Sequence, residues 1–565
     1  MRGCLEARFD VHGQTRRQGT ELGKGECPGR QDRSGVLIID RELFMPTNRS
    51  TIQKRPGWRF GSKNILSILT AVFLMGSGLP AFAIDKDMKA QNAGKAIIGE
   101  GSASDEQPIG PPSKTFKVLS KESAVCVSCH MKENTGLYQQ WGNSKHYGAN
   151  IGCYECHKAE EGEPDAVRHK DFLISTIVSP KDCAECHERQ AREFDKSHHA
   201  TAGLILGSLD NVLAEVVEGS IYGQMAIRGE SAAAVQGCWQ CHGSPIKVLP
   251  DGKLDPATWP NTGIGRLNPD GSKGSCTACH QRHDFSQEQV RHPEICGKCH
   301  MGPDHPQKEI YEESTHGAAF RANLDKMNMG SEKWIPGEDY SAAPTCTTCH
   351  MSATRDLPIN HDVGDRISWT LRPPISVKVD ERPTKQSGEV RSALERRKDM
   401  KSVCRSCHQT EWIENWYEQY DAVVHTYNDK FAKPGAAIMK LLLEEGLRTK
   451  TVFDEEIEWT WFFLWHHEGR RARHGAAMQG PDYVQWHGFY EVAHRFYMEF
   501  IPQIKEITHE AEQHGKADSA KKVHALLDEI LNRPEHMWFL GKTPPGKAAH
   551  NKKRLEFMKK FSGGH

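Results

Sequence analysis

Eight C-x-x-C pairs account for 16 of the 18 cysteines in this 565-residue chain, and a histidine follows each pair directly. The paired cysteines are Cys126 and Cys129, Cys153 and Cys156, Cys183 and Cys186, Cys238 and Cys241, Cys276 and Cys279, Cys296 and Cys299, Cys346 and Cys349, and Cys404 and Cys407. The histidines after them are His130, His157, His187, His242, His280, His300, His350 and His408. Two such thiols can form thioethers to the porphyrin vinyl groups, and the adjacent imidazole can bind the iron. Zinc ribbons, redox-active pairs and disulfide frameworks do not need that histidine, so the pattern predicts eight covalently bound haem c groups.

The composition fits a chain whose core is filled partly by porphyrins. Hydrophobic residues make up only 37% of the sequence, and 73 Lys+Arg against 74 Asp+Glu leave a formal charge of −1. This balance excludes an integral membrane bundle and a nucleic-acid-binding protein dominated by basic charge. The 283 residues from Cys126 to His408 carry all eight motifs. Because that is too few for a separate side-chain core around each porphyrin, the porphyrins must supply much of the buried apolar material.

A secretory signal peptide is predicted in residues 45–83. Basic residues precede a mainly apolar run at 65–79, and a small-x-small cleavage sequence follows at 81–83. A membrane anchor is the weaker alternative, because Gly76, Ser77 and Gly78 interrupt the run. Residues 1–44 are interpreted as an over-long gene start or an unstructured leader, and residues 84–115 as a flexible lead-in.

Export would remove Cys4 and Cys27, the two cysteines outside the motifs. The first 83 residues carry 13 Lys+Arg and 7 Asp+Glu, so subtraction from 73 and 74 leaves 60 basic and 67 acidic residues. An acidic surface suits electron exchange with small basic carriers. The sequence therefore predicts a periplasmic or otherwise extracytoplasmic protein, without a transmembrane span once the signal is cleaved.

The predicted fold class is mainly α, in two successive parts. Residues 116–410 form an octahaem cytochrome c domain of short helices and loops around the haems. Residues 411–540 form a C-terminal helical bundle, because aromatic and aliphatic residues recur there at three- and four-residue spacing. Its helices are expected at 411–433, 436–445, 454–467, 483–500 and 504–531. A mobile tail, 541–565, is predicted to follow.

Axial ligation divides the haems into two classes. Electron-transfer haems take a second axial ligand, whereas a catalytic haem keeps one face open for substrate. The candidate distal ligands are His146, His169, the adjacent pair His198 and His199, His283, His316, His361 and His425. Counting the adjacent pair once gives seven sites for eight irons, which predicts one open haem. The alternative for any one of them is an ordinary surface or capping histidine.

From Cys126 to about Phe500 the chain resembles the octahaem hydroxylamine oxidoreductase family. The likeness lies in the order of the eight motifs, the spacing of the seven histidine sites, the RHDFS segment after CTACH and the PDH segment after CGKCH. The resemblance implies that the fourth motif carries the catalytic haem and that Asp304 and His305 are the catalytic pair. Such a pair over an open iron can move the protons that accompany changes in N–O or N–H bonds.

Two residues depart from the hydroxylamine-oxidising members of that family. Those enzymes cross-link a tyrosine to the catalytic porphyrin, often within an oligomer. Tyr483 aligns with it only with a gap, and an ungapped match gives Gln485 or Trp486. Arg372 stands where a second active-site tyrosine is expected, and an arginine there attracts an anion such as nitrite. Loss of the cross-link fits the reductive members of the family, so the direction of the reaction stays open.

The resemblance implies a periplasmic enzyme that interconverts hydroxylamine and more oxidised species, nitric oxide or nitrite, at the fourth haem. The other seven haems would relay electrons to or from a partner cytochrome or a quinone-linked protein. The alternatives are a reductive member converting nitrite to hydroxylamine or ammonium, a hydrazine dehydrogenase, and a non-catalytic electron-transfer cytochrome. No nucleic acid is expected as partner. Relatives form homo-oligomers, trimers among them, and the same is expected here.

Overall fold

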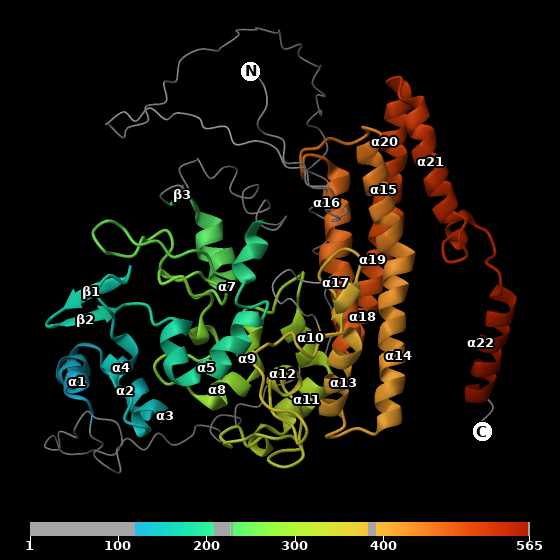
Figure 1. The fold of residues 1–565 in the computed structure, drawn as a ribbon. Coiled ribbons are helices and arrows are strands. Elements are labelled where there is room, and N and C mark those ends of the chain that lie inside the picture. Colours follow the sequence, from blue (N-terminus) through green and yellow to red (C-terminus); the bar gives the residue numbers. More distant parts are fainter. Residues whose placement is uncertain (1–118, 208–225, 228–229, 382–390, 563–565) are drawn as a thin grey trace, which may run out of the picture. The chain divides into compact units, whose positions relative to one another are not determined.

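The computed structural model describes residues 119–207, 226–227, 230–381 and 391–562, all within one compact unit that begins at Ser104. The leader, the signal peptide, the lead-in, Cys4 and Cys27 lie outside the described residues. The described chain is mainly helical, with short helices first and long helices after them (Figure 1), which confirms the predicted fold class.

Short helices make up the region that carries the motifs. They are α1 (Lys121–Glu133), α2 (Thr135–Asn143), α3 (Lys145–Gly148), α4 (Cys153–His157), α5 (Pro180–Lys196), α7 (Trp239–His242), α8 (Gln287–Arg291), α9 (Pro293–Gly297), α10 (Gln307–Glu313), α11 (Thr315–Ala322), α12 (Cys346–His350) and α13 (Ala393–Cys404). Two motifs, CYECH and CTTCH, are helices in their own right, α4 and α12. Because residues i, i+3 and i+4 share a helix face, this winding brings both thiols and the imidazole to one side.

The strands in the described residues form short antiparallel hairpins. They are β1 (Ala166–His169) with β2 (Phe172–Ser175), β3 (Ala226–Ile227) with β4 (Glu230–Ser231), and β5 (Trp369–Thr370) with β6 (Val377–Lys378). In the first hairpin His169 pairs with Phe172, so the turn presents His169 at its tip. The connection between β5 and β6 carries Arg372, and the pairing of Trp369 with Lys378 fixes its base.

The C-terminal bundle that the sequence predicts is made of helices, several of them joined end to end. They are α14 (Thr410–Tyr427), α15 (Lys433–Glu444), α16 (Glu456–Phe462), α17 (Gly469–Met478), α18 (Pro481–Val484), α19 (Glu491–Arg495), α20 (Ile501–Gln513) and α21 (Ala517–Leu531). In Figure 1 most of these helices stand side by side. Their core contains Phe431, Ile438, Leu442, Ile457, Leu464, Val492, Phe496, Phe500, Ile504, Val523 and Ile530.

The boundaries of the bundle helices differ from the predicted ones at π-helical turns. The chain stays helical through η6 (Asn428–Ala432), η7 (Phe463–Glu468) and η9 (Phe496–Phe500), so α14 runs on into α15 and α16 into α17. Pro434 and Pro502, which look like helix breaks in the sequence, lie just after such turns. Proline has no backbone N–H to donate to the carbonyl four residues back. In a π-helical turn that regular hydrogen bond is already absent, so proline is tolerated there.

The last helix departs from the predicted tail. Residues Lys547–Ser562 form α22, and every one of its side chains is exposed. Within the described ranges, no helix combines the length and the apolar character needed to cross a membrane.

Candidate haem cavity and catalytic pair

One connected cavity of about 3100 Å³ runs through the motif region, and its walls are largely apolar. Every motif contributes its histidine to the lining: His130, His157, His187, His242, His280, His300, His350 and His408. An apolar space bordered by paired thiols and imidazoles is the donor set that covalently bound haem requires. The residues present therefore fit haem c.

Five motif histidines face a candidate distal histidine across this cavity. The ring centres are 6.1 Å apart for His130–His169, 6.4 Å for His157–His283, 6.2 Å for His187–His146, 6.0 Å for His300–His199 and 6.1 Å for His408–His316. With metal–nitrogen bonds of about 2.0 Å, two imidazoles on opposite sides of one metal ion have centres roughly 6 Å apart. These five pairs thus have the spacing that a shared iron demands.

A buried serine precedes three of these distal histidines by two positions. The pairs are Ser144 and His146, Ser197 and His199, and Ser314 and His316. Each serine hydroxyl donates to the carbonyl of an aromatic residue three positions back and accepts the backbone N–H three positions on. Such N-caps start a new helical turn, so each serine fixes the backbone from which its histidine points.

The other distal candidates are placed by one loop. His361 lines the cavity. Burial lowers the pKa of His280 to about 4, and the charge of His361 is the next largest cause of that lowering. His198 lies against Gly364 of the same loop. Burial lowers the pKa of His350, and the backbone of Val363 opposes that shift. The loop therefore brings His361 toward the fifth motif and contacts both His198 and the seventh motif.

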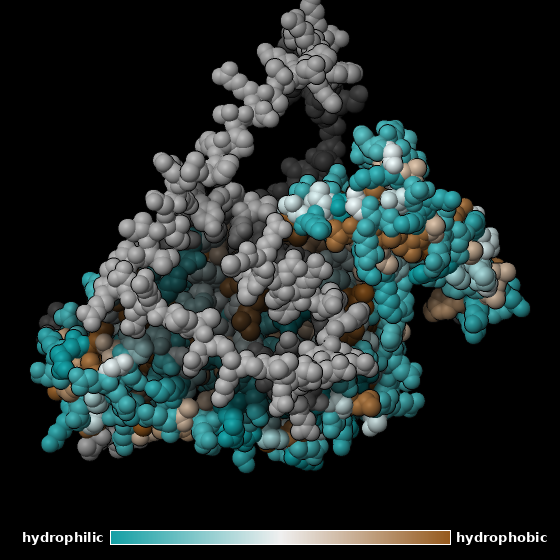
Figure 2. Space-filling model, turned by 45° about the horizontal axis from the view of Figure 1, so that its top comes forward, coloured by the Kyte–Doolittle hydropathy of each residue, from teal (hydrophilic) through white to brown (hydrophobic). Residues whose placement is uncertain are grey.

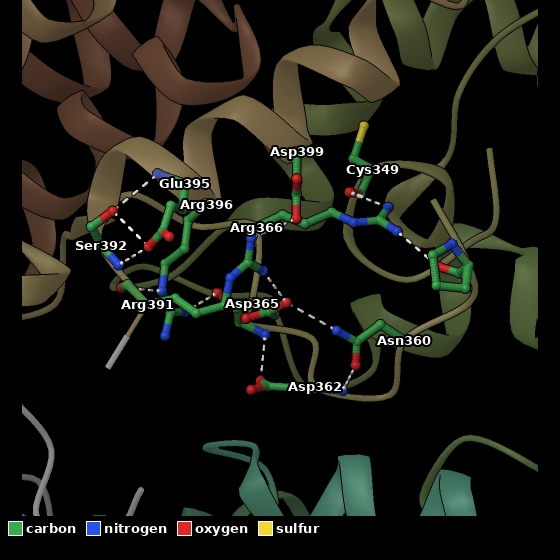
Figure 3. Close-up of polar contacts among 12 residues, drawn as sticks. Cys349, Asn360, Asp362, Asp365, Arg366, Arg391, Ser392, Glu395, Arg396 and Asp399 are labelled. Atoms are coloured by element: carbon green, nitrogen blue, oxygen red, sulfur yellow. Dashed lines mark hydrogen bonds and ion pairs between the residues drawn. The ribbon is translucent and has the colours of Figure 1, made fainter. Parts of the chain in front are cut away.

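Hydrogen bonds hold this loop rigidly against the seventh motif (Figure 3). Asn360 donates to Asp365 at 3.0 Å, and Arg391 donates to Asp365 at 2.5 Å. Arg366 donates to the carbonyl oxygen of Cys349 at 3.1 Å, which ties the loop to α12. The position of His361 thus depends on side-chain hydrogen bonds and not on a regular element.

The distal set differs in two respects from that expected from the sequence. The sequence predicts one site from the pair His198 and His199, yet His199 faces the sixth motif while His198 lies against Gly364. His425 is exposed on α14, packs against Trp369 at 5.5 Å and does not line the cavity. Seven cavity-lining candidates remain, and the contacts above associate six of them with the first, second, third, fifth, sixth and eighth motifs.

Asp304 and His305 form a hydrogen-bonded pair beside the cavity. His305 donates through Nδ1 to Asp304 Oδ1 at 2.5 Å and through Nε2 to the carbonyl oxygen of Cys299 at 2.8 Å. Burial alone would lower the pKa of His305, but the hydrogen bond and charge of Asp304 raise it above the ordinary value. Because both ring nitrogens face acceptors, these surroundings favour the protonated imidazole.

The fourth motif lies next to this pair. The Cys241 thiol is within hydrogen-bonding reach of the Cys299 thiol. Among the charged groups near Cys241, His305 lowers the pKa of its thiol the most. Two motifs that stand far apart in the sequence therefore meet where Asp304 and His305 project. The fourth motif and the pair that the family resemblance names are therefore neighbours in the structure.

The C-terminal bundle contributes basic side chains to the same place. Arg470 Nη1 lies 3.4 Å from Asp304 Oδ2, and His466 Nδ1 lies 3.9 Å from it. Arg470 Nε also donates to the carbonyl oxygen of Arg372 at 3.0 Å. Burial would raise the pKa of Asp304, but His305 and then His466 and Arg470 lower it to about 2. Asp304 is therefore a carboxylate held between cations.

Arg372 and Tyr483 lie in different surroundings. Arg372 lines the cavity, and its exposed surface faces that space. Burial and then the charge of Arg372 lower the pKa of His199 to about 4. Tyr483 is half-buried on α18, 5.4 Å from the ring of His487, and does not line the cavity. Gln485 and Trp486 are exposed.

Comparison with known proteins points to the same family. A family model described as "Seven times multi-haem cytochrome CxxCH" matches residues 270–453, and one described as "Cytochrome c554 and c-prime" matches residues 182–249. The chain is 26% identical over 362 residues to a probable nitrite reductase–hydroxylamine oxidoreductase fusion protein of Kuenenia stuttgartiensis, covering 57% of this chain and 38% of that protein. A solved structure titled "Hypothetical multiheme protein" matches with 26% identity and a TM-score of 0.61, covering 70% of this chain and 98% of that one. The chain is thus similar to multihaem cytochromes c of the hydroxylamine-oxidoreductase-like kind.

A more distant relative extends the group. The cytochrome is 21% identical over 233 residues to the multiheme cytochrome MtrA of Shewanella baltica, covering 41% of this chain and 56% of that protein. The chain thus spans less than two thirds of the length of either curated relative. The matches to multihaem cytochrome CxxCH models support covalently bound haem c in this chain.

Sequence reasoning missed the basic residues that the bundle of this cytochrome supplies. His466, Arg470 and His474 recur at four-residue spacing along η7 and α17, and all three are buried. Arg470 and His474 line the cavity. The sequence did carry a signal for this site. The three basic residues share one face of a helix that is predicted to pack in a core, and charged side chains are rarely buried without partners.

Proposed function

We propose that this cytochrome is a periplasmic octahaem oxidoreductase that interconverts hydroxylamine and nitric oxide or nitrite at the haem of the fourth motif. One observation carries the proposal. The hydrogen-bonded pair of Asp304 and His305 lies beside Cys241, in a cavity that all eight motifs border. A proton carrier at an iron with a free face is what a nitrogen oxidoreductase needs.

The protein side chains account for the movement of protons. When bound, the haems supply the iron for the nitrogen compound and the path for its electrons. His305 donates from both ring nitrogens and therefore holds a proton that it can give up as an N–O bond breaks. Asp304 holds the ring in that orientation, and Arg470 anchors Asp304 from the bundle. In the opposite direction the neutral imidazole takes the proton that leaves hydroxylamine.

Arginines at the cavity favour the reductive direction, from nitrite to hydroxylamine or ammonium. Arg372 faces the cavity, and Arg470 joins its backbone to Asp304. A guanidinium attracts an anion such as nitrite and does little for neutral hydroxylamine or hydrazine. Tyr483 lies outside the cavity of its own chain, so a tyrosine–haem link, the mark of the oxidative enzymes, would need a tyrosine from a second copy.

A homo-oligomer is part of the proposal. Trp486, Tyr490 and Met498 are 57%, 54% and 55% exposed and follow Tyr483 along the same helical stretch. Large exposed apolar side chains in one stretch are typical of contact surfaces. A trimer would bury them and could bring Tyr483 toward a neighbouring subunit. Electron exchange with a partner cytochrome or a quinone-linked protein completes the proposed role.

Steady-state assays of the haem-loaded protein test the reaction. Nitrite reduction with a reduced viologen and hydroxylamine oxidation with a cytochrome acceptor are measured for the wild type, Asp304→Asn and the control Asp325→Asn. Asp325 is an exposed carboxylate on a separate turn. We expect Asp304→Asn to lower kcat by about 10²- to 10⁴-fold, because a positioned proton carrier contributes that much, and the control to match the wild type.

Two outcomes would contradict the proposed function. If the wild type has full haem content and shows neither activity, the proposed reaction is wrong, and a hydrazine dehydrogenase or a non-catalytic electron-transfer cytochrome would remain. Equal kcat values for Asp304→Asn and the wild type would remove the pair from the reaction.

A further inference from the structure

Buried polar atoms without a hydrogen-bond partner gather where α10 packs against η7 and α17. Among the described residues they include Glu309 Oε2, His467 Nδ1, Glu468 Oε2 and Arg471 Nε. In Figure 1 α10 lies beside α17, in agreement with the contacts between the two helices. On the face shown in Figure 2 the described side chains are mostly hydrophilic, as polar groups at a surface should be, whereas these four atoms are buried. Buried polar atoms of native proteins nearly always have a partner, so these four require one.

Water suits these four atoms better than an ion does. The carboxylate oxygens of Glu309 and Glu468 only accept hydrogen bonds, whereas Arg471 Nε only donates one. An anion would be repelled by the two carboxylates, and a metal cation by the guanidinium. A water molecule both donates and accepts, and buried waters commonly join several polar groups that lack protein partners.

Glu468 is the most deeply buried carboxylate of this group. Its side chain is 3% exposed, and both Nε and Nη2 of Arg495 on α19 lie 2.8 Å from its Oε1. Both contacts are made to one oxygen, so Oε2 is left for water. Burial raises the pKa of Glu468, and Arg495 and then Arg471 oppose that shift. Such a carboxyl takes up and releases a proton closer to neutral pH than an exposed one does.

Two histidines of η7 connect Glu468 with Asp304. His466 Nδ1 lies 3.9 Å from Asp304 Oδ2, and the ring centres of His466 and His467 are 5.3 Å apart. Burial and then His466 lower the pKa of His467 to about 4, and Asp304 opposes that shift. At neutral pH the imidazole of His467 is therefore uncharged, with one nitrogen that accepts a proton and one that donates it.

Glu491 connects the same group with solvent. Arg471 Nη2 lies 3.9 Å from Glu468 Oε1 and 2.8 Å from Glu491 Oε2. The Glu491 side chain is 35% exposed, and its Oε1 lies 3.2 Å from Nδ1 of the exposed His487 on η8 (Gln485–Tyr490). Acid–base groups thus follow one another from the start of α19 to Asp304, with gaps that water can bridge.

We propose that protons travel between solvent and the pair of Asp304 and His305 along these groups, from Glu491 through ordered water to Glu468 and on through His467 and His466. Each transfer breaks one O–H or N–H bond and forms another, and the electron that balances the proton arrives separately through the haems. Oxidation of hydroxylamine would send protons outward by the same groups. Glu468 is a relay residue and does not touch the nitrogen compound. The path deepens the proposed function, because it rests on the role proposed there for the pair.

Turnover of the haem-loaded full chain in ordinary and heavy water tests the path. We expect Glu468→Gln to lower kcat about tenfold or more without raising KM, because proton supply then limits the rate while the contacts to substrate are intact. The ratio of kcat in ordinary water to kcat in heavy water should rise for the same reason. Glu468→Asp keeps a carboxyl and should recover part of the rate.

The matched control removes a carboxylate from the same arginine. Glu499 Oε2 accepts a hydrogen bond from Arg495 Nη1 at 2.6 Å, and Glu499 lies on η9, off the path. Glu499→Gln should therefore keep the wild-type kcat and the wild-type isotope ratio. Equal losses in Glu468→Gln and Glu499→Gln would assign Glu468 a structural role through Arg495 and overturn the path.

Infrared difference spectra of the reduced and oxidised protein test the same carboxyl without a nitrogen substrate. We expect a carboxyl C=O band that shifts in heavy water, is missing from Glu468→Gln and persists in Glu499→Gln. Absence of that band from the wild type would overturn the path. If Glu468→Gln does not retain its haems, His467→Gln takes its place in the turnover test, because it leaves the contact with Arg495 intact.

The outcomes separate the path from the proposed reaction. An inactive wild type that shows the Glu468 band contradicts the reaction and supports the path. A wild type with activity that Asp304→Asn loses and Glu468→Gln keeps contradicts the path alone.

Discussion

The two regions of this cytochrome are held together by different means. In the bundle, side chains such as Ile438, Leu442 and Phe500 are fully buried and pack on one another. The motif region instead surrounds a cavity of about 3100 Å³. Its buried residues include many small polar ones, among them Ser144, Ser197 and Ser314, which cap short helices. The bundle therefore has an ordinary side-chain core, while the motif region, apart from a small cluster around Trp334, needs its haems as core.

Preventing haem attachment should produce the largest difference in stability between the two regions. In chain expressed without the haem-attachment machinery, we expect rapid proteolysis across residues 119–408 and protection across 411–531. Without haem, the residues that line a cavity of this size lose their packing contacts. The bundle core does not depend on haem. Limited proteolysis with mass spectrometry measures the cleavage sites. Equal protection of both regions would show that the motif region also folds on side chains alone.

A cavity made in the bundle should have the next largest effect. Leu442 is fully buried and Leu443 is 36% exposed, so they form a matched pair on α15. Leu442→Ala should cost about 2–5 kcal/mol of stability, and Leu443→Ala much less. Hydrogen exchange across residues 431–531 measures the loss, with haem absorbance as the control for the other region. Similar exchange in the two variants would contradict the assigned bundle core.

A substitution where the two regions contact each other should have a smaller effect on stability, and that effect should depend on pH. Asp421 on α14 accepts hydrogen bonds from Arg397 at 2.7 Å and Trp369 at 2.8 Å. Burial would raise the pKa of Asp421, but these partners lower it to about 2. A lowered pKa stabilises the fold above the ordinary carboxyl pKa, and this contribution disappears as the pH falls toward 2.

Asp421→Asn should therefore reduce stability by about 2 kcal/mol at pH 7 and by about half of that at pH 3. Thermal unfolding of both proteins across this pH range measures the difference. A difference that grew on acidification would mean that the pKa of Asp421 is raised and not lowered.

The smallest effect concerns a single cap in the motif region. Ser314→Ala removes the hydroxyl that accepts the N–H of Gly317 and should cost about 1 kcal/mol. Because α11 carries His316, the eighth haem should also release its distal ligand more readily, giving faster cyanide binding at that haem. Ser128→Ala, at an exposed hydroxyl of α1, should change neither property. Unchanged cyanide kinetics in Ser314→Ala would show that the cap does not position His316.

Much of this arrangement follows from sequence, and the reasons for the rest are physical. The motifs and the bundle helices follow from local spacing, and the recurrent aromatic-x-x-Ser-x-His pattern would have selected His199 over His198. Arg470 and Asp304 are 166 residues apart, and local periodicity carries no information about such a contact. His425 occupies a plausible sequence position, yet the face of α14 that bears it turns away from the cavity.

Electron paramagnetic resonance of the ferric protein tests the central claim most directly, that seven haems have two histidine ligands and the fourth has a free face. We predict a high-spin signal that integrates to about one of the eight irons encoded by the motifs, because an iron with two imidazoles is low-spin. The signal should become low-spin with cyanide and be missing from Cys238→Ala/Cys241→Ala. A ferric protein with eight haems and no high-spin iron, or a high-spin signal that survives loss of the fourth motif, would contradict the account.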